Sequence, residues 1–292
     1  MLQRWNFAVR HLRNVPAVFK TSHFSTQMPH LKAEWGYTEE NGPSTWCNLP
    51  GVKIGNRQSP IDIIQAKASF DESLKSLQFS YPNFEKATLN NNGHTIMFAP
   101  GDDENAFVVR GGPVTHTYKL AQFHFHWGVH DDVGSEHTVD GKPYAAELHL
   151  VHYNTDLYAS AGDALTAENG LIVFGIFLTV GDTEHAGLQK IIDKISQIQS
   201  SGASITLESA FNPIVLFPDN LDYWSYPGSL TTPPLSESVT WVVFKQPIVV
   251  SSGQVAAFRE IESADGQCLC QNFRPTCELN GRVVKASFKY KA

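Results

Sequence analysis

Residues 122–127 read QFHFHW, residues 147–152 read ELHLVH, and these two stretches decide the fold. Side chains alternate between the two faces of an extended strand, so each stretch has one polar and one apolar side. In the first stretch His124 and His126 share a face with a glutamine, while three aromatic rings occupy the other face. If the second stretch pairs beside the first, His149 comes up to the two histidines.

The three histidines form a candidate metal site. The alternative is that a His-x-His pair on a strand is only hydrogen-bonded, which is the commoner case. Gln122 and Glu147 lie on the histidine faces of the two stretches, where such side chains hold imidazole N–H groups and fix the tautomer. Three neutral imidazoles around a free fourth position are typical of a catalytic zinc centre. His152, on the opposite face of its strand, is predicted to be structural.

The rest of the chain reads as one β-rich domain. Turn signals such as Asn92-Gly93 and Asn280-Gly281 separate short apolar runs, which is typical of strands joined by tight turns. Apolar spacing predicts two amphipathic helices, over 186–199 and 252–261. The expected class is therefore α+β and β-rich, with predicted strands at 107–110, 116–127, 146–153, 171–180 and 239–244.

Residues 1–33 differ from the rest of the chain in charge. They contain five basic residues, whereas all 29 acidic residues lie from Glu34 onward. A basic, acid-free segment with Ser and Thr and without a long apolar run is typical of a mitochondrial presequence. We therefore expect a mitochondrial location; a basic tail without a targeting role, and hence a cytoplasmic protein, is the alternative, and a secreted protein is less favoured.

Charge and hydropathy exclude two classes of partner. The body of the chain is acidic and has no Lys/Arg cluster, so it lacks the basic surface that binds nucleic acid. The longest apolar stretch, residues 171–178, is far shorter than the roughly 20 residues that span a bilayer. Neither a nucleic-acid partner nor a membrane span is expected.

The cysteines are too few and too unevenly placed for a disulfide scaffold in a chain of 292 residues. Cys268, Cys270 and Cys277 crowd one segment, and Cys47 lies far from them. A thiolate metal site there would lack a fourth ligand at a suitable spacing. No role is assigned to the cysteines.

Further motifs carry a resemblance to a known family. In order and spacing they closely resemble those of the eukaryotic-type α-class carbonic anhydrases, the standard example of a three-histidine zinc site. Besides the two histidine stretches, the motifs are WGY at 35–37, NGP at 41–43, QSPID at 58–62, NNGH at 91–94, GSEHTVD at 134–140, SLTTPP at 229–234 and KASF at 285–288. The match covers about residues 34–288 and leaves 289–292 as a tail. It implies a monomeric single domain around a large, twisted, mostly antiparallel sheet with short peripheral helices.

The resemblance implies an activity and its chemistry. His124, His126 and His149 would hold Zn2+, and a hydroxide in the fourth position would attack CO2 to give bicarbonate and a proton. Thr231 would accept the hydroxide's hydrogen bond and donate its own to Glu136. The partners are then only small molecules, namely CO2, bicarbonate and water.

The resemblance also assigns the surrounding positions. His94 matches the proton shuttle, while Tyr37 and Asn92 match residues that order water between shuttle and metal. Gln122 and Glu147 match residues that orient the ligands. CO2 would be held by residues that otherwise read as turn or core positions, namely Val151, Val173, Leu230, Thr231, Thr232 and Trp241.

Four positions depart from the family pattern. Met97 stands where an amide often lines the water network and Thr95 replaces a smaller residue, so altered proton transfer is expected. Ala161 replaces a bulky aromatic at the cavity mouth, and Leu235 stands where secreted members place a cysteine.

The alternative to an enzyme is a non-catalytic binding module, but such relatives typically lack a ligand histidine. Ester hydrolysis is expected only as a side activity.

Overall fold

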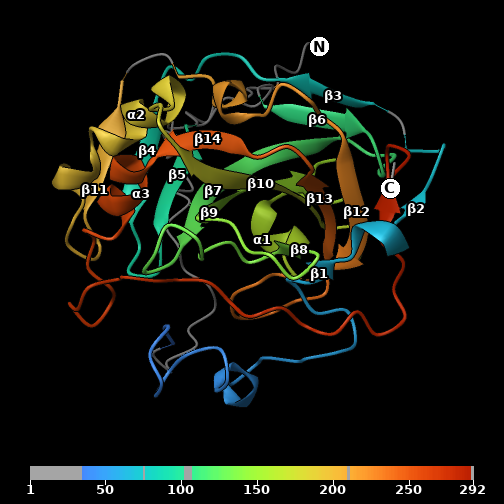
Figure 1. Ribbon diagram of the computed structural model, residues 1–292, viewed down its shortest axis with the longest axis horizontal. Helices are drawn as coiled ribbons and strands as arrows, with labels where there is room; N and C mark the ends of the chain where they lie inside the picture. Colours follow the sequence, from blue (N-terminus) through green and yellow to red (C-terminus); the bar gives the residue numbers. More distant parts are fainter. Residues whose placement is uncertain (1–34, 75, 102–106, 209–210, 291–292) are drawn as a thin grey trace, which may run out of the picture. The chain divides into compact units, whose positions relative to one another are not determined.

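The centre of the domain is a 13-stranded mixed sheet in which β7 (Tyr118–Trp127), β9 (Ala146–Asn154) and β10 (Leu171–Gly181) lie side by side (Figure 1). The computed structural model describes residues 35–74, 76–101, 107–208 and 211–290. The predicted presequence at 1–33 lies outside the described residues. The remaining strands are β1 (Asp62–Ile63), β2 (Ser69–Phe70), β3 (Leu77–Ser80), β4 (Ala87–Asn91), β5 (Ile96–Pro100), β6 (Val108–Gly111), β8 (Thr138–Val139), β11 (Ser204–Leu207), β12 (Tyr223–Gly228), β13 (Val239–Phe244), β14 (Ile248–Ser251) and β15 (Lys285–Ala286).

Strand order follows the hydrogen-bonded path β11-β4-β5-β7-β9-β10-β13-β12-β15-β2. The pairs from β4 to β10 are antiparallel, whereas β10 pairs with both β13 and β14 in parallel. β1 and β8 form a separate two-stranded sheet. The predicted β-rich α+β class is confirmed, and each of the five predicted strands is present with ends shifted by no more than a few residues.

A bulge in β7 keeps its apolar side chains on one face. The register shifts between Leu120 and Gln122, so Ala121 is an extra residue in the strand. Because an extra residue reverses the alternation of side chains, Leu120 and Phe123 both point into the same apolar cluster. The bulge thus lets the full strand bury its apolar side while Gln122 and the histidines face the other way.

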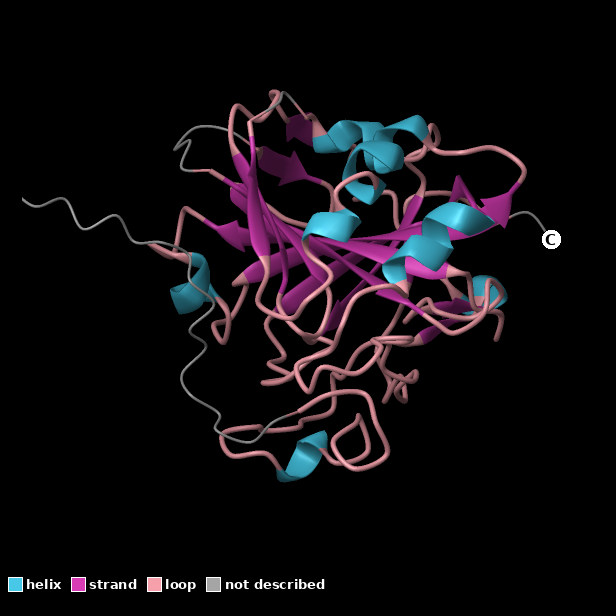
Figure 2. Ribbon diagram, turned by 90° about the vertical axis from the view of Figure 1, so that its left-hand side faces the viewer, coloured by secondary structure: helices cyan, strands magenta, loops and turns pink. Residues whose placement is uncertain are grey.

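The core consists of two apolar clusters, one on each side of the central strands. The larger contains the aromatic face of β7, and α2 (Ala186–Ile192) and α3 (Ser252–Phe258) pack against it. The ring of Phe258, for example, lies 4.8 Å from that of Phe125 between centroids. The smaller cluster contains Val151 and Trp241 on the histidine side. In Figure 2 the strands fan across the middle, with several helices above them and mostly loops below.

Short helices complete the fold. They are α1 (Ala161–Ala164) and the 3-10 turns η1 (Trp46–Asn48), η2 (Gln65–Lys67), η3 (Ile195–Gln197) and η4 (Pro213–Leu216). The prediction of one helix over 186–199 was wrong, since α2 ends at Ile192 and η3 follows. Leu188, Ile191, Ile195 and Ile198 are buried all the same and Ile192 is half-buried, because the three-residue step from Ile195 to Ile198 fits a 3-10 turn as well as an α-helix. The helix predicted over 252–261 ends earlier, at Phe258.

Loops from both ends of the described chain meet on the histidine side of the sheet. The amide of Cys277 donates to the carbonyl of Pro60 at 2.8 Å, and the guanidinium of Arg274 donates to Oε1 of Gln58 at 2.9 Å. Figure 1 shows the blue and red segments running together below the sheet. These loops therefore form the surroundings of the histidine face.

The cysteines are partly paired in the structure. Cys268 and Cys270 are joined by a disulfide, which the sequence did not predict, and Cys47 and Cys277 are free.

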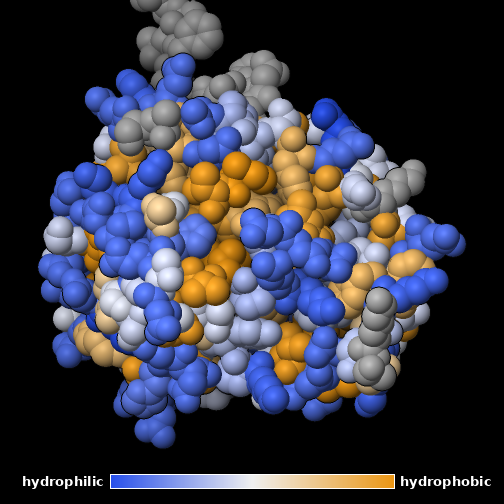
Figure 3. Space-filling view, turned by 45° about the horizontal axis from the view of Figure 1, so that its top comes forward, coloured by the Kyte–Doolittle hydropathy of each residue, from blue (hydrophilic) through white to orange (hydrophobic). Residues whose placement is uncertain are grey.

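On the face seen in Figure 3, hydrophobic surface is interrupted by hydrophilic side chains. Within the described ranges, every helix is too short or too polar to cross a bilayer.

Candidate active site

Pairing of β7 with β9 brings the three predicted ligands together. His124 lies directly opposite His149 in the register, and Nε2 of His124 lies 3.1 Å from Nε2 of His126. One ring nitrogen of each histidine lies within 4.8 Å of the others. His126 and His149 are each 1% exposed, whereas His124 is half-buried, so the cluster is largely buried and is reached from the side of His124.

Each imidazole is held by a hydrogen bond on the side away from the cluster. Nδ1 of His124 donates to Oε1 of Gln122 at 2.8 Å, and Nε2 of His149 donates to Oε1 of Glu147 at 2.7 Å. Nδ1 of His126 donates to the backbone carbonyl of Asn272 at 2.8 Å. With these protons placed outward, the inward nitrogens carry lone pairs, which is the form that binds a metal.

The electrostatics of the cluster favour neutral rings beside a charged carboxylate. Burial lowers the pKa of His124 well below its usual value, and burial also lowers that of His126 against the opposing charge of Glu136. Burial works against ionisation of Glu147, yet the neighbouring His137 and His149 hold its pKa well below the usual range. Neutral imidazoles oriented by a carboxylate are the donor set that zinc takes.

Glu136 presents an unsatisfied oxygen to the cluster. Its Oε1 accepts from the amide of Arg274 at 2.8 Å, while Oε2 lies 3.4 Å from Nε2 of His126 and 3.7 Å from Nδ1 of His149. Among the described residues this buried oxygen has no hydrogen-bond partner. A metal with its bound water would place a polar group there, so the residues present fit zinc.

His137 supports the cluster, a role that sequence reasoning missed. Its Nδ1 lies 2.7 Å from Oε1 of Glu147, and its Nε2 lies 2.6 Å from the hydroxyl of Tyr226. His137, Glu147 and His149 could also be grouped as a metal site. Because both ring nitrogens of His137 are already bonded, this second grouping positions Glu147 and leaves no donor for an ion.

The predicted CO2-binding side chains lie beside the histidines. Val173 pairs with Val151 on one side and with Trp241 on the other, across three neighbouring strands. The ring of Trp241 lies 4.8 Å from that of His149 between centroids. Leu230 packs against the same apolar cluster, so these four residues form an apolar wall next to the site.

Thr231 and Thr232 lie in the loop between β12 and β13. Thr231 is buried, and the carbonyl of Thr232 accepts a hydrogen bond from the amide of Leu235 at 2.9 Å. Leu235 is itself fully buried, with a positive φ of 61°. The loop is thus tightly turned, which places Thr231 at a fixed position after the end of β12.

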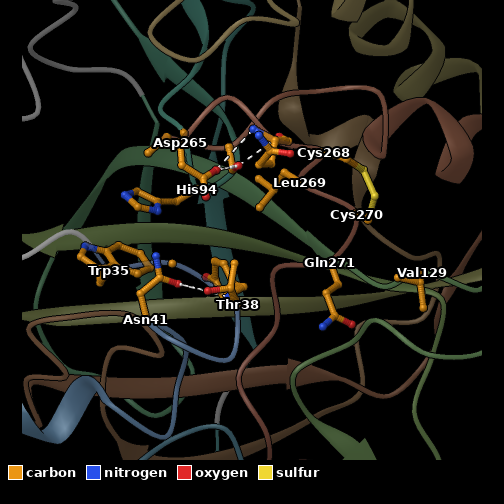
Figure 4. A pocket seen from close by; sticks show the side chains of 16 residues that line it. Trp35, Thr38, Asn41, His94, Val129, Asp265, Cys268, Leu269, Cys270 and Gln271 are labelled. Atoms are coloured by element: carbon orange, nitrogen blue, oxygen red, sulfur yellow. Dashed lines mark hydrogen bonds between the residues drawn. A yellow bond between two sulfur atoms is a disulfide. The ribbon is translucent and has the colours of Figure 1, made fainter.

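His94 lines a cavity of about 250 Å³ together with Tyr37 and Trp35. Figure 4 shows His94 and Trp35 in this cavity. Its ring stacks on Trp35, with centroids 3.8 Å apart and planes 6° apart. Burial lowers the pKa of His94 to about 4. Burial, followed by the charge of Glu136, raises the pKa of Tyr37 well above its usual value. The shuttle candidate and Tyr37 therefore share one cavity, with the His94 ring held in its neutral form.

The remaining predicted positions are Asn92 and three residues that depart from the family pattern, namely Thr95, Met97 and Ala161. Oδ1 of Asn92 accepts from the amides of His94 and Thr95 at 3.0 and 2.9 Å. The hydroxyl of Thr95 donates to the carbonyl of Phe125 at 2.5 Å, and Met97 lies opposite His124. Ala161, at the start of α1, is buried. In this structure, then, Asn92 shapes the turn that carries His94.

Comparison with known proteins places the chain in a family. The family model described as eukaryotic-type carbonic anhydrase matches residues 41–288. The chain belongs to this family. It is 46% identical over 259 residues to human carbonic anhydrase 7, covering 87% of this chain and 97% of that protein. The corresponding mouse protein is 45% identical over the same length. As a carbonic anhydrase, the chain is an enzyme that hydrates carbon dioxide.

Proposed function

We propose that the chain holds Zn2+ on His124, His126 and His149 and hydrates CO2 at that centre. The observation that carries the proposal is the orientation of the three imidazoles. Each donates its outward N–H to a fixed acceptor and turns its other nitrogen toward the shared centre. A purely structural histidine cluster would instead pair its inward nitrogens with donors of the protein.

Zinc, when bound, supplies a Lewis acid that brings the pKa of a water near neutrality, an effect for which carbonic anhydrase is the standard example. The protein then has to orient the nucleophile. Oε2 of Glu136 is buried and unpaired, so it is available as an acceptor, and we assign the hydroxyl of Thr231 as its donor. Thr231 in turn accepts a hydrogen bond from the attacking oxygen, which aims a lone pair at the carbon of CO2.

CO2 is apolar overall and needs an apolar place beside the nucleophile. Val151, Val173, Leu230 and Trp241 supply that wall on the histidine side of the sheet. Thr232, next to Thr231, offers a hydroxyl to the bicarbonate oxygens as they form. The product carries a charge that the apolar wall cannot solvate, so bicarbonate leaves toward water.

Each turnover leaves a proton that has to reach solvent. His94 and Tyr37 line one cavity, and we assign His94 as the group that receives the proton through water ordered by Tyr37 and Asn92. A relay at neutral pH needs a pKa near 7. The stacked ring, with a pKa of about 4, therefore accepts a proton only after leaving Trp35 for water.

The test is stopped-flow CO2 hydration on the full chain, with zinc content measured on the same sample. We expect about one zinc per chain, and His149→Ala should lose both zinc and activity because a three-histidine site loses a ligand. His116→Ala, at a half-exposed histidine elsewhere, is the matched control and should keep both. Zinc bound without hydration would contradict the proposal and favour a binding module. Light scattering on this sample tests the proposed monomer.

We also propose that residues 1–33 direct the chain to mitochondria. The support is their basic, acid-free composition. Fractionation of cells that express the full chain, with N-terminal sequencing of the recovered protein, should find it in mitochondria and shortened near Glu34. Recovery of the uncut chain in the cytoplasmic fraction would contradict this proposal.

A further inference from the structure

The Cys268–Cys270 disulfide lies on the wall of the cavity that contains His94. Both cysteines and the intervening Leu269 line this cavity together with His94 and Trp35 (Figure 4). The other two cysteines of the chain, Cys47 and Cys277, are free thiols. The one disulfide in the described residues is therefore placed next to the proposed proton shuttle.

Stabilisation of the fold is a poor explanation for the Cys268–Cys270 disulfide. The stabilisation that a disulfide gains from restricting the unfolded chain grows with the length of the loop that it closes. Here the two cysteines are separated by two positions, so very little of the unfolded chain is restricted. Cys268 is exposed and Cys270 is half-buried. Accessible disulfides of this kind exchange readily with thiols and are the regulatory ones.

The segment that carries the disulfide holds the turn of His94 in place. The amide of Ala264 donates to the carbonyl of Gly93 at 3.0 Å. Nδ2 of Asn272 donates to the carbonyl of His94, also at 3.0 Å. The backbone of the shuttle candidate is thus bonded to residues on both sides of the Cys268–Cys270 pair.

Between Ala264 and Asn272, the side chain of Leu269 packs in the core and is only 4% exposed. Its carbonyl accepts from Nε1 of Trp127 at 2.9 Å, and its amide donates to the carbonyl of Ile261, also at 2.9 Å. The disulfide joins the residues on either side of Leu269. A change at the two sulfurs therefore acts directly on the segment that holds His94.

We propose that Cys268 and Cys270 form a reversible redox site whose state sets the rate of proton transfer through His94. In the disulfide form the segment is closed and holds the backbone of the His94 turn in one place, while the His94 ring remains free to leave Trp35. In the dithiol form the two side chains rotate independently, and the thiol of Cys268 can donate to the carbonyl of Arg259, 3.5 Å from its sulfur. This inference rests on the proposed shuttle role of His94.

The reactant is a low-molecular-weight thiol such as glutathione. Its thiolate attacks Sγ of the exposed Cys268, the bond between the two protein sulfurs breaks, and Cys270 leaves as a thiolate that takes a proton. A second thiolate attacks the small-molecule sulfur of the mixed disulfide. Cys268 is released and protonated, and one molecule of oxidised glutathione forms. The two electrons gained by the protein come from two glutathione thiols, and oxidised glutathione drives the reverse reaction.

The first measurement is a thiol count that does not depend on activity. The full, zinc-loaded chain is equilibrated at stepped ratios of reduced to oxidised glutathione, unfolded and alkylated. We expect all four cysteines to be alkylated at the reducing end and only the two free ones at the oxidising end. Peptide mass mapping should locate the change at Cys268 and Cys270. Four reactive thiols at every ratio would overturn the proposal.

The second measurement is CO2 hydration in both redox states. The proton is exported after the step that forms bicarbonate. Slower export therefore lowers kcat and leaves kcat/KM unchanged. We expect kcat in weak buffer to be at least about twofold lower in the reduced chain, because a His94 ring that swings from a loosely held backbone turn spends less time in productive geometry. The difference should persist in C47S/C277S, which removes two cysteines and keeps the pair, and vanish in C268S/C270S. Equal kcat values in the two states would overturn the proposal.

A third readout separates this inference from the proposed function. Absence of hydration in both redox states would contradict the function itself. The imidazole proton resonance of His94, assigned with His94→Ala, then decides the inference. A position that differs between the oxidised and reduced chains supports it, and a position that is the same in both contradicts it.

Discussion

Nδ1 of His126 donates a hydrogen bond to the backbone carbonyl of Asn272 at 2.8 Å, although 146 residues separate the two. The side chain of Asn272 fixes that carbonyl. Its Oδ1 accepts from the amide of Trp127 at 2.7 Å, and its Nδ2 donates to the carbonyls of His94 and Phe125. One asparagine thus connects a proposed metal ligand, the central strand and the turn of the shuttle candidate.

Asn272→Ala should weaken zinc binding without removing a ligand. The carbonyl that orients His126 would lose its support, and loss of such a support typically costs about 10- to 100-fold in metal affinity. Competition with a chelator of known zinc affinity measures the effect. Asn48→Ala, at an exposed asparagine, is the control and should leave affinity unchanged. Equal affinities for both variants would contradict the orienting role.

Glu147→Gln should also lower zinc affinity, again by about 10- to 100-fold. The carboxylate accepts from the rings of His137 and His149 and from the amides of Glu136 and His137. An amide in its place can accept at only one end and would turn its own N–H groups toward donors. The chelator competition measures this variant too, with Glu85→Gln at an exposed position as the control. Retained affinity would show that Glu147 has only a packing role.

Phe125→Ala should destabilise the fold through its effect on the face opposite the histidines. Phe125 is fully buried and packs on Phe258 of α3. Loss of such a ring leaves a cavity and should lower the free energy of unfolding by about 3–5 kcal/mol. Denaturant unfolding measures it, with Phe70→Ala, 41% exposed, as the control. A loss no larger than that of the control would mean that α3 closes the space.

His94 should make the fold less stable in acid. Burial lowers its pKa from 6.5 to about 4, so the unfolded chain binds this proton more readily than the folded chain between those pH values. Its contribution to stability is complete above pH 6.5 and is lost as the pH falls toward 4. Denaturant unfolding across this range should show a shallower loss for His94→Asn than for the parent chain. His116→Asn is the matched control, and identical slopes for the parent chain and His94→Asn would refute the prediction.

Local periodicity was enough to predict the strands and the histidines that the structure brings together as a candidate metal site. Alternation along residues 122–127 and 147–152 places Gln122, His124, His126, Glu147 and His149 on shared faces, and the structure brings these histidines together. Periodicity did not determine the end of the helix predicted over 186–199. Residues three and four apart are buried equally well by an α-helix and by an α-helix followed by a 3-10 turn.

Strand alternation is a local property of the backbone, so the residue pattern was enough to show which side chains share a face. Which distant groups meet that face depends on tertiary packing. The register of β7 against β9 sets the approach of His149, and packing of the loops brings up the Asn272 carbonyl, Arg274 and the Cys268–Cys270 pair. A backbone carbonyl carries no side-chain signature, so no residue pattern could have assigned Asn272 to His126. Such contacts depend on the path of the whole chain.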